Sequence, residues 1–320
     1  MKKYTLQDTS NSNIKRVCDR NNNWLHYHLV KENKDLRAVN YILDKGYAKG
    51  LGFYTALKNS SPEEWDKKLE KAGDKGDAVH QSIRTTLQVG KFSIEDKVLS
   101  ENNKDTRVLT FEEWECILAF GRFWNDHDMK LVDVEQTVAD EKNGFAGTLD
   151  MIATMRKSCG GRYCDCTPHI NKLGLWDHKS GSGIYENYGA QLAAYESAQL
   201  GHLHRYIEYT AIDHLGTNHK VGYKLEFYDL GETAKHWKEF LAAKTIHDAT
   251  YKPFVLEAEN ENIPDLIELK QETKAELLAQ TVQVLAKKFN SRNGMVLKPK
   301  LKLRKGVRKV RAIKNVTINK

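Results

Sequence analysis

Three strand-like segments follow one another in the middle of the chain, and they restrict the fold more than any other feature. Each has the length of a β-strand, and the first also has its two-residue period. They are residues 131–138, 145–154 and 173–179. A segment with helical spacing follows at 185–200, and further strand-like segments follow at 206–212 and 221–227. This order predicts an α/β fold with a central mixed β-sheet flanked by helices.

Two helix starts precede these strands. The run Ser-Pro-Glu-Glu from Ser61 and the run Thr-Phe-Glu-Glu from Thr110 each place a capping hydroxyl before acidic residues, which stabilise the positive end of a helix. The first helix, or a pair of helices broken at 73–76, is expected to reach Leu87. Helical spacing also predicts a helix over 36–47, whereas the polar segment before residue 24 is expected to be loosely ordered.

The expected architecture is therefore an α/β core with a helical N-terminal wrap and a basic C-terminal tail. Amphipathic spacing predicts further helices near the C-terminus. The expected parts are an N-terminal polar and helical region (1–72), a core (73–255) with a cysteine-bearing insertion (156–172), a C-terminal helix (256–290) and a basic tail (291–320).

The formal charge of +7 is unevenly distributed along the sequence. From Lys287 onward there are 13 lysines and arginines and no acidic residue, so the rest of the chain carries about −6. Such a segment is either a solvated tail or a contact for a polyanion, most often nucleic acid. We expect DNA contacts, with salt-sensitive affinity, from Lys298, Lys300, Lys302, Arg304 and Lys305.

The sequence predicts neither a membrane span nor a secretory signal, because no apolar run approaches the ~18 residues that a span requires. A cytoplasmic protein is therefore expected, in the host cytoplasm if a phage encodes it. The five cysteines are an odd number, which argues against a framework of disulfides.

The third strand-like segment ends in a charged tripeptide. Because alternate residues of a strand share a face, Asp177 and Lys179 should lie together while His178 points away. Asp150 lies near the end of the preceding segment. Two carboxylates beside a lysine can hold a hard divalent cation next to a cationic group, although an aspartate paired with a surface lysine is the commoner meaning of the tripeptide alone.

Five motifs in a fixed order give this tripeptide more weight. They are Gly-x-x-Val-His ending at His80, Val-Glu-x-x-Val around Glu135, Gly-Thr-Leu-Asp ending at Asp150, Trp-Asp-His-Lys-Ser-Gly around Asp177, and Gln-Leu-Ala-Ala-Tyr from Gln191. Together they resemble the PD-(D/E)xK nucleases, in particular the RecB-type domains, their CRISPR-associated relatives and the mitochondrial single-strand exonuclease. The similarity runs from about residue 73 to 227.

This resemblance implies a restriction-endonuclease-like core that binds Mg²⁺ or Mn²⁺ as one or two ions. Asp150 and Asp177 match the metal-binding acids, and His80 matches a histidine that binds the metal or lies next to it. The backbone carbonyl of His178 would complete the ligand shell. Lys179 matches the catalytic lysine.

Two further assignments follow from the same resemblance. Gln191 and Tyr195 match a Gln-x-x-x-Tyr motif that lies against the DNA and the active site. Glu135 matches an acid that the family often places on the preceding strand, and it is assigned to the catalytic group.

The activity implied is metal-dependent hydrolysis of DNA, by an exonuclease acting on single strands or ends in replication, recombination or repair. An endonuclease, an RNA nuclease and an inactive nucleic-acid-binding or structural protein with the same fold are the alternatives. A helicase or a recombination or replication protein is a candidate partner. The chain has no Gly-x4-Gly-Lys phosphate loop, so ATP is not expected.

A cluster of soft ligands lies between the segments that contain Asp150 and Asp177. Cys159, Cys164, Cys166 and His169 fall within eleven residues and could form a structural zinc site, although the spacing is not the usual pair of Cys-x2-Cys knuckles. The alternative is an exposed hairpin tip with reduced thiols. Some of the nucleases that the chain resembles carry an iron–sulfur cluster, whose four cysteines lie one before and three after the nuclease core. Such a cluster is not expected here, because this chain has no cysteine beyond Cys166.

Overall fold

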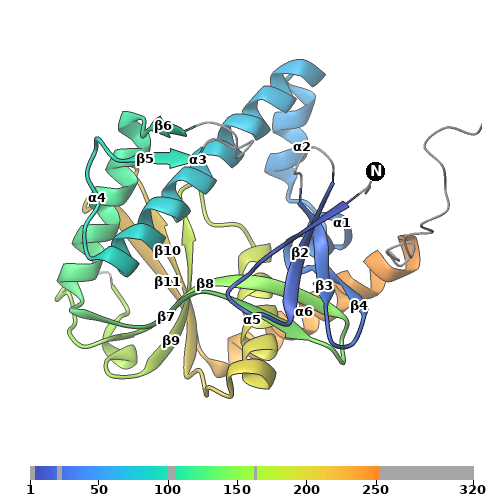
Figure 1. Cartoon of the computed structure of the whole chain (residues 1–320). Helices are drawn as coiled ribbons and strands as arrows, with labels where there is room; N and C mark the ends of the chain where they lie inside the picture. Colours follow the sequence, from blue (N-terminus) through green and yellow to red (C-terminus); the bar gives the residue numbers. More distant parts are fainter. Residues whose placement is uncertain (1–3, 20–23, 100–105, 162–163, 252–320) are drawn as a thin grey trace, which may run out of the picture. The chain divides into compact units, whose positions relative to one another are not determined.

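The three-dimensional structure is a computed structural model of the chain that describes residues 4–19, 24–99, 106–161 and 164–251 (Figure 1). The expected C-terminal helix and basic tail lie outside these residues. The described strands are β1 (Tyr4–Gln7), β2 (Ile14–Asp19), β3 (Trp24–Leu29), β4 (Lys34–Ala38), β5 (Lys97–Leu99), β6 (Thr106–Val108), β7 (Met129–Asp140), β8 (Phe145–Met155), β9 (Leu173–Lys179), β10 (Tyr209–Leu215) and β11 (Tyr223–Tyr228).

The described helices fall between groups of these strands. They are α1 (Val39–Gly46), α2 (Leu51–Lys58), α3 (Pro62–Val89), α4 (Phe111–Asp126), α5 (Asn187–Leu203) and α6 (Leu230–Thr250), with a short 3-10 turn, η1 (Thr167–His169), in the connection from β8 to β9. None of the described helices is both long and apolar enough to cross a membrane.

One large mixed sheet organises the described residues. Its strands are ordered β1-β2-β3-β4-β8-β9-β10-β11, with β7 also paired to β8. The β4–β8 and β9–β10 pairs are parallel, and the others are antiparallel. A parallel pair requires a crossover connection, and α5 provides it between β9 and β10. The expected mixed α/β sheet is therefore confirmed.

Strand β8 divides one of its edges between two partners. It pairs with β4 at Phe145 and Ala146, and with β9 from Met151 to Thr154. β7 pairs with β8 from Phe145 to Met155 on the other edge, with small irregularities. Residues 147–150 thus lie where β8 leaves β4 and has not yet joined β9. This interval places Asp150 at a fork in the sheet.

Helices cover both faces of the sheet (Figure 1). On one face α3 and α4 pack against Met151, Trp176 and Tyr209 in an apolar cluster. On the other face α1, α5 and α6 pack against Leu149 and Leu175. Two apolar layers flank the sheet, so the strands between them are held rigidly by burial on both sides.

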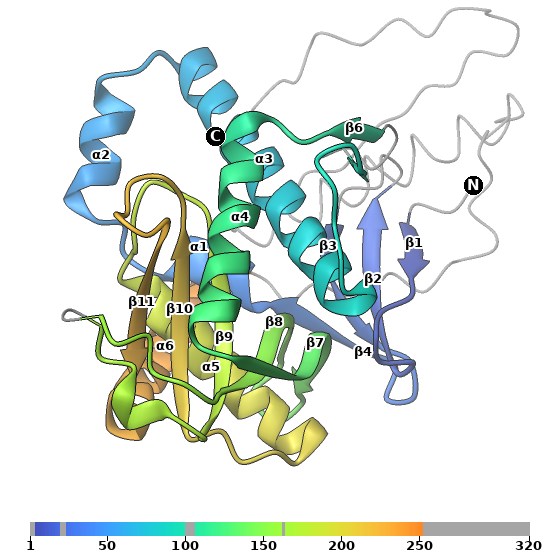
Figure 2. The same ribbon diagram turned by 90° about the vertical axis from the view of Figure 1, so that its left-hand side faces the viewer.

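The N-terminal segment differs from its prediction. Residues expected to be loosely ordered include β1 and β2, which continue the sheet beyond β3 and β4; Figure 2 shows these blue strands beside β7 and β8, away from β10 and β11. The polar composition of the segment hid these strands, of which β1 is at the edge of the sheet and β2 buries Ile14 and Val17. The helix predicted from Leu36 begins only at Val39, because Leu36 pairs with Tyr27 in the sheet.

Both predicted helix caps are confirmed. Ser61 and Thr110 each accept a hydrogen bond from the backbone N–H three residues on, and the glutamate there bonds back to the cap. α3 runs unbroken for 28 residues through Gly76. The expected boundary between residues 72 and 73 therefore falls inside a continuous helix.

We predict that Gly46→Ala destabilises the protein. A Cβ at Gly46 would lie 1.9 Å from the backbone oxygen of Ala243, where α1 meets α6. The shifts that remove such an overlap destabilise the folded state by about 1–3 kcal/mol. The midpoint of thermal unfolding should therefore fall. Gly121→Ala on α4, where a Cβ meets no atom within 4 Å, is the control and should leave the midpoint unchanged or higher.

Candidate metal centre

Three side chains from three elements converge at the fork. His80 from α3, Glu135 from β7 and Asp150 from β8 each offer a ligand atom, and these atoms all lie within 4.8 Å of one another. Nδ1 of His80 is 3.3 Å from Oδ2 of Asp150. Two carboxylates and an imidazole suit a divalent cation. The structure thus brings together three residues that are 55 and 15 positions apart in the sequence.

Asp150 is the most constrained member of this group. Its Oδ2 also accepts a hydrogen bond of 2.9 Å from the backbone N–H of His178, which links β8 to β9 where the two strands begin to pair. Burial opposes its ionisation, but the charges of His80, His178 and Lys179 outweigh burial and lower the pKa of Asp150. The carboxylate is therefore ionised at neutral pH.

Glu135 reaches the centre through an unusual backbone conformation. Its φ of 53° is in the left-handed region, which non-glycine residues seldom adopt. Val134 pairs with Met151 and Gln136 with Leu149, so Glu135 lies across from Asp150. Thr137, two positions on, contacts Thr148 of β8 at 3.0 Å between their hydroxyl oxygens. The left-handed conformation is thus a local departure from strand geometry at the residue whose carboxylate reaches the centre.

Asp177 and Lys179 emerge together, as the strand period predicts. Nζ of Lys179 is 2.5 Å from Oδ2 of Asp177, and both side chains lie on the α5 side of β9. His178 points to the other face. Asp177 is beside the converging trio and is not within it, because Lys179 holds its carboxylate. Its role as a metal ligand stays a prediction.

The Gln-x-x-x-Tyr residues of α5 support this ion pair. Gln191 donates to Oδ1 of Asp177 at 3.2 Å and accepts from Nζ of Lys179 at 3.3 Å. It also lies 3.4 Å from the hydroxyl of Tyr195. Both Gln191 and Tyr195 are buried. In the described structure these two residues position Lys179 and Asp177. Because their side chains are buried, their predicted contact with DNA stays a prediction.

Two other residues of the interval shape the same region. A Cβ at Gly147 would lie 2.3 Å from the ring of Tyr195, so the glycine leaves room for that ring beside β8. Nζ of Lys179 lies 4.6 Å from the centre of the Tyr188 ring. A cation over an aromatic face is held in place by the charge distribution of the ring.

A buried pair beneath the centre was not predicted from the sequence. Nδ1 of His178 lies 2.7 Å from Oδ1 of Asp213 on β10, and both side chains are almost fully buried. Burial opposes the charged ring, but Asp213 outweighs it and raises the pKa of His178. The pair cross-links β9 to β10 just behind Asp177. Sequence spacing could not reveal it, because the partners are 35 residues apart.

The centre carries an excess of buried negative charge. Burial raises the pKa of Asp177 to about 6. The charge of Lys179 opposes this rise, and the charge of Asp150 adds to it. Burial and the charge of Asp150 also raise the pKa of Glu135. His80 shows the converse effect: burial lowers its pKa, but Asp150 raises it to about 9 overall. Charge repulsion of this kind is relieved by a bound cation.

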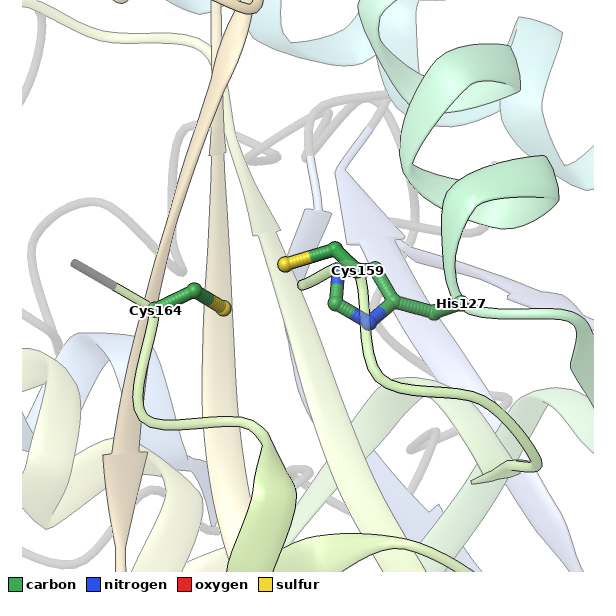
Figure 3. A group of neighbouring side chains, drawn as sticks. All are labelled: His127, Cys159 and Cys164. Atoms are coloured by element: carbon green, nitrogen blue, oxygen red, sulfur yellow. The ribbon is translucent and has the colours of Figure 1, made fainter. Parts of the chain in front are cut away.

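A second cluster of ligand atoms lies at the other end of β8. Cys159, Cys164 and His127 offer atoms within 4.8 Å of one another, and Figure 3 shows the two thiols pointing toward each other beside the His127 ring. Sγ of Cys166 is 3.7 Å from Sγ of Cys159. Burial and hydrogen bonds with Cys166 and Cys159 raise the pKa of Cys164.

His169 was predicted as the histidine of this cluster, but it is not among the ligand atoms that converge here. Its ring stacks on Phe227 with centroids 4.4 Å apart, and it also contacts Tyr209. The 3-10 turn after Cys166 thus places the His169 ring against side chains of β10 and β11. His127 takes its place from the end of α4. No spacing in the sequence connects His127 with the cysteines.

The predicted DNA-binding residues of the tail lie outside the described residues. They are Lys298, Lys300, Lys302, Arg304 and Lys305. Within the described residues, Arg84 lies one helical turn after His80. Its positive charge partly opposes the rise in the pKa of Glu135 that burial and Asp150 cause. Arg84 was not predicted as a site residue, although residues four positions apart on a helix are neighbours and His80 was predicted.

Comparisons with known proteins add no family. No family model and no curated protein matches the chain. Among solved structures, the crystal structure of SSO0001 aligns over 67% of this chain and 87% of that one, with 12% identity and a TM-score of 0.25. A similarity at that level supports no inference, so the site is interpreted from its own geometry.

We predict that Glu135→Gln weakens Mn²⁺ binding, measured by isothermal titration calorimetry on the full chain. Loss of one carboxylate from a three-residue set should reduce affinity on the order of 10–100-fold. Glu141→Gln, an exposed position in the turn after β7, is the control and should bind Mn²⁺ as the wild type does. Unchanged affinity in a folded Glu135→Gln variant would exclude the carboxylate from the centre.

Proposed function

We propose that the protein is a divalent-metal-dependent nuclease of the PD-(D/E)xK type that hydrolyses phosphodiester bonds of DNA. One observation carries this proposal: His80, Glu135 and Asp150 converge at a forked strand, beside a lysine that is ion-paired to a second aspartate. The motifs that resemble the nuclease family contribute all five of these residues. A resemblance of sequence motifs and a convergence in space are separate observations.

The donor set fits Mg²⁺ or Mn²⁺. Carboxylate oxygens are the ligands that hard divalent cations prefer, and a mixed set with one imidazole also suits Mn²⁺. His80, Glu135 and Asp150 would hold the ion, with Asp177 as a further candidate. When bound, the cation would neutralise the scissile phosphate and lower the pKa of a bound water.

Lys179 has the position expected of a catalytic lysine in this reaction. Its side chain is 15% exposed, which gives a substrate phosphate access to it, while Asp177, Gln191 and Tyr188 contact its ammonium group from the protein side. From there it could donate a hydrogen bond to the attacking water or to a phosphate oxygen that gains charge. Preorganised donors of this kind stabilise a transition state because they need not reorient during the reaction.

An aromatic path leads outward from Lys179. Tyr188 lies under the lysine, and Tyr185 contacts Tyr188 edge-to-face with ring centroids 5.5 Å apart. Tyr185 is 52% exposed and lines a cavity of about 660 Å³. Exposed aromatic rings bind unpaired bases by stacking on them. The bases inside a duplex are not free to stack in this way. This arrangement favours single-stranded DNA or frayed ends, in agreement with the exonuclease that the motifs imply.

The test compares substrates that differ in a single property. End-labelled linear and circular single-stranded DNA, and RNA of the same sequence, are incubated with the protein in Mg²⁺, Mn²⁺ or EDTA. Degradation of the linear DNA alone is expected, and only with a divalent cation. Cleavage of circles would identify an endonuclease, preference for RNA would identify a ribonuclease, and binding without cleavage would contradict the proposed activity.

We predict that Lys179→Ala reduces the cleavage rate by about 10²–10³-fold and changes affinity for single-stranded DNA only slightly. The reason is that the ammonium group acts on charge that develops during the reaction. Lys130→Ala, an exposed lysine at the start of β7, is the matched control. Cleavage by Lys179→Ala at the wild-type rate would overturn the assignment of this lysine.

A further inference from the structure

The connection from β8 to β9 is long for one that contains so little regular structure. It runs over residues 156–172, and η1 is the regular element among those of its residues that the structure describes. Loops of this length inside a compact domain are uncommon unless they are functional or held by other means. Three of the five cysteines of the chain lie in it. The region therefore needs a stabilising interaction beyond its backbone hydrogen bonds.

His127 meets this connection from the end of α4. Its backbone carbonyl accepts hydrogen bonds from the N–H groups of Arg156 and Lys157, at 3.1 Å and 3.0 Å. Its side chain is fully buried, and among the described residues Nδ1 has no hydrogen-bond partner. A buried ring nitrogen without a partner is costly. It points to a ligand that the ring would bind.

The sulfur atoms have the spacing of a shared metal. Sγ of Cys159 and Sγ of Cys166 are 3.7 Å apart. A disulfide requires about 2.0 Å. Two thiolates on one tetrahedral zinc, each ~2.3 Å from the ion, are about 3.8 Å apart. The distance between the sulfur atoms of Cys159 and Cys166 therefore matches two thiolates that share a zinc ion and not a disulfide.

The backbone around Cys159 also suits a bound thiolate. The N–H of Gly161 donates to Sγ of Cys159 at 3.4 Å, and Gly160 makes the turn with a φ of 68° that favours glycine. Ser158 Oγ lies 3.4 Å from Sγ of Cys166. Hydrogen bonds to metal-bound sulfur of this kind orient the ligand and reduce its charge.

We propose that His127, Cys159, Cys164 and Cys166 form a structural zinc site. Three thiolates and one imidazole complete a tetrahedral shell, which leaves no open position for substrate. The site would tie the junction of α4 and β7 to the connection between β8 and β9. It thereby braces the strands that contain Glu135, Asp150 and Asp177 without taking part in the reaction.

The first test is the metal content of the full chain, purified without chelators under reducing conditions and measured by plasma mass spectrometry. About one zinc per chain and no iron is expected. A folded protein that holds no zinc after incubation with Zn²⁺ would overturn the proposal, as would stoichiometric iron. Replacing the zinc with Co²⁺ should give the strong visible bands of a tetrahedral thiolate site.

The second test distinguishes the two histidines. His127→Ala should reduce zinc content several-fold, whereas His169→Ala should retain it, because His169 stacks on Phe227. Retention by His127→Ala, or loss by His169→Ala alone, would contradict the proposed ligand set.

A third measurement needs no variant and so does not depend on whether one folds. In the wild-type chain, zinc should protect Cys159, Cys164 and Cys166 from alkylation, and a chelator should expose them more than tenfold, as followed by peptide mass spectrometry. Cys18 and Cys116, buried elsewhere, serve as internal references. Equal alkylation of the three thiols with and without chelator would contradict the site.

Discussion

The divided pairing of β8 is the constraint on which the candidate centre depends. One edge of this strand pairs with β4 at its beginning and with β9 at its end, and residues 147–150 lie between the two. In this interval the backbone N–H of His178 donates a hydrogen bond to the side-chain carboxylate of Asp150, where a regular sheet would use a backbone carbonyl of β8. A regular sheet would close this interval with its own hydrogen bonds and would leave no room for an acidic group between strands.

The layers around the fork supply the rest of the centre. α3 covers one face and contributes His80, while α5 covers the other and holds Lys179 through Gln191. The cysteine connection and His127 lie at the far end of β8 and β9. We propose different roles for these two ligand clusters, with the chemistry at one end of the strands and a structural site that fixes the strands at the other.

Sequence patterns predicted what local rules determine. Capping hydroxyls located α3 and α4, and the two-residue period placed Asp177 and Lys179 on one face. The patterns failed where tertiary contacts decide the outcome. β1 and β2 lie in a polar segment without an apolar period, and His127 joins cysteines more than 30 positions away. No local spacing encodes either of these.

We propose that the fork holds a divalent cation. Anomalous diffraction from crystals grown with Mn²⁺ would locate the ion without assumptions about activity. We expect a strong peak bounded by His80, Glu135 and Asp150. An ordered centre with no peak there, or a peak confined to other acidic groups, would contradict it.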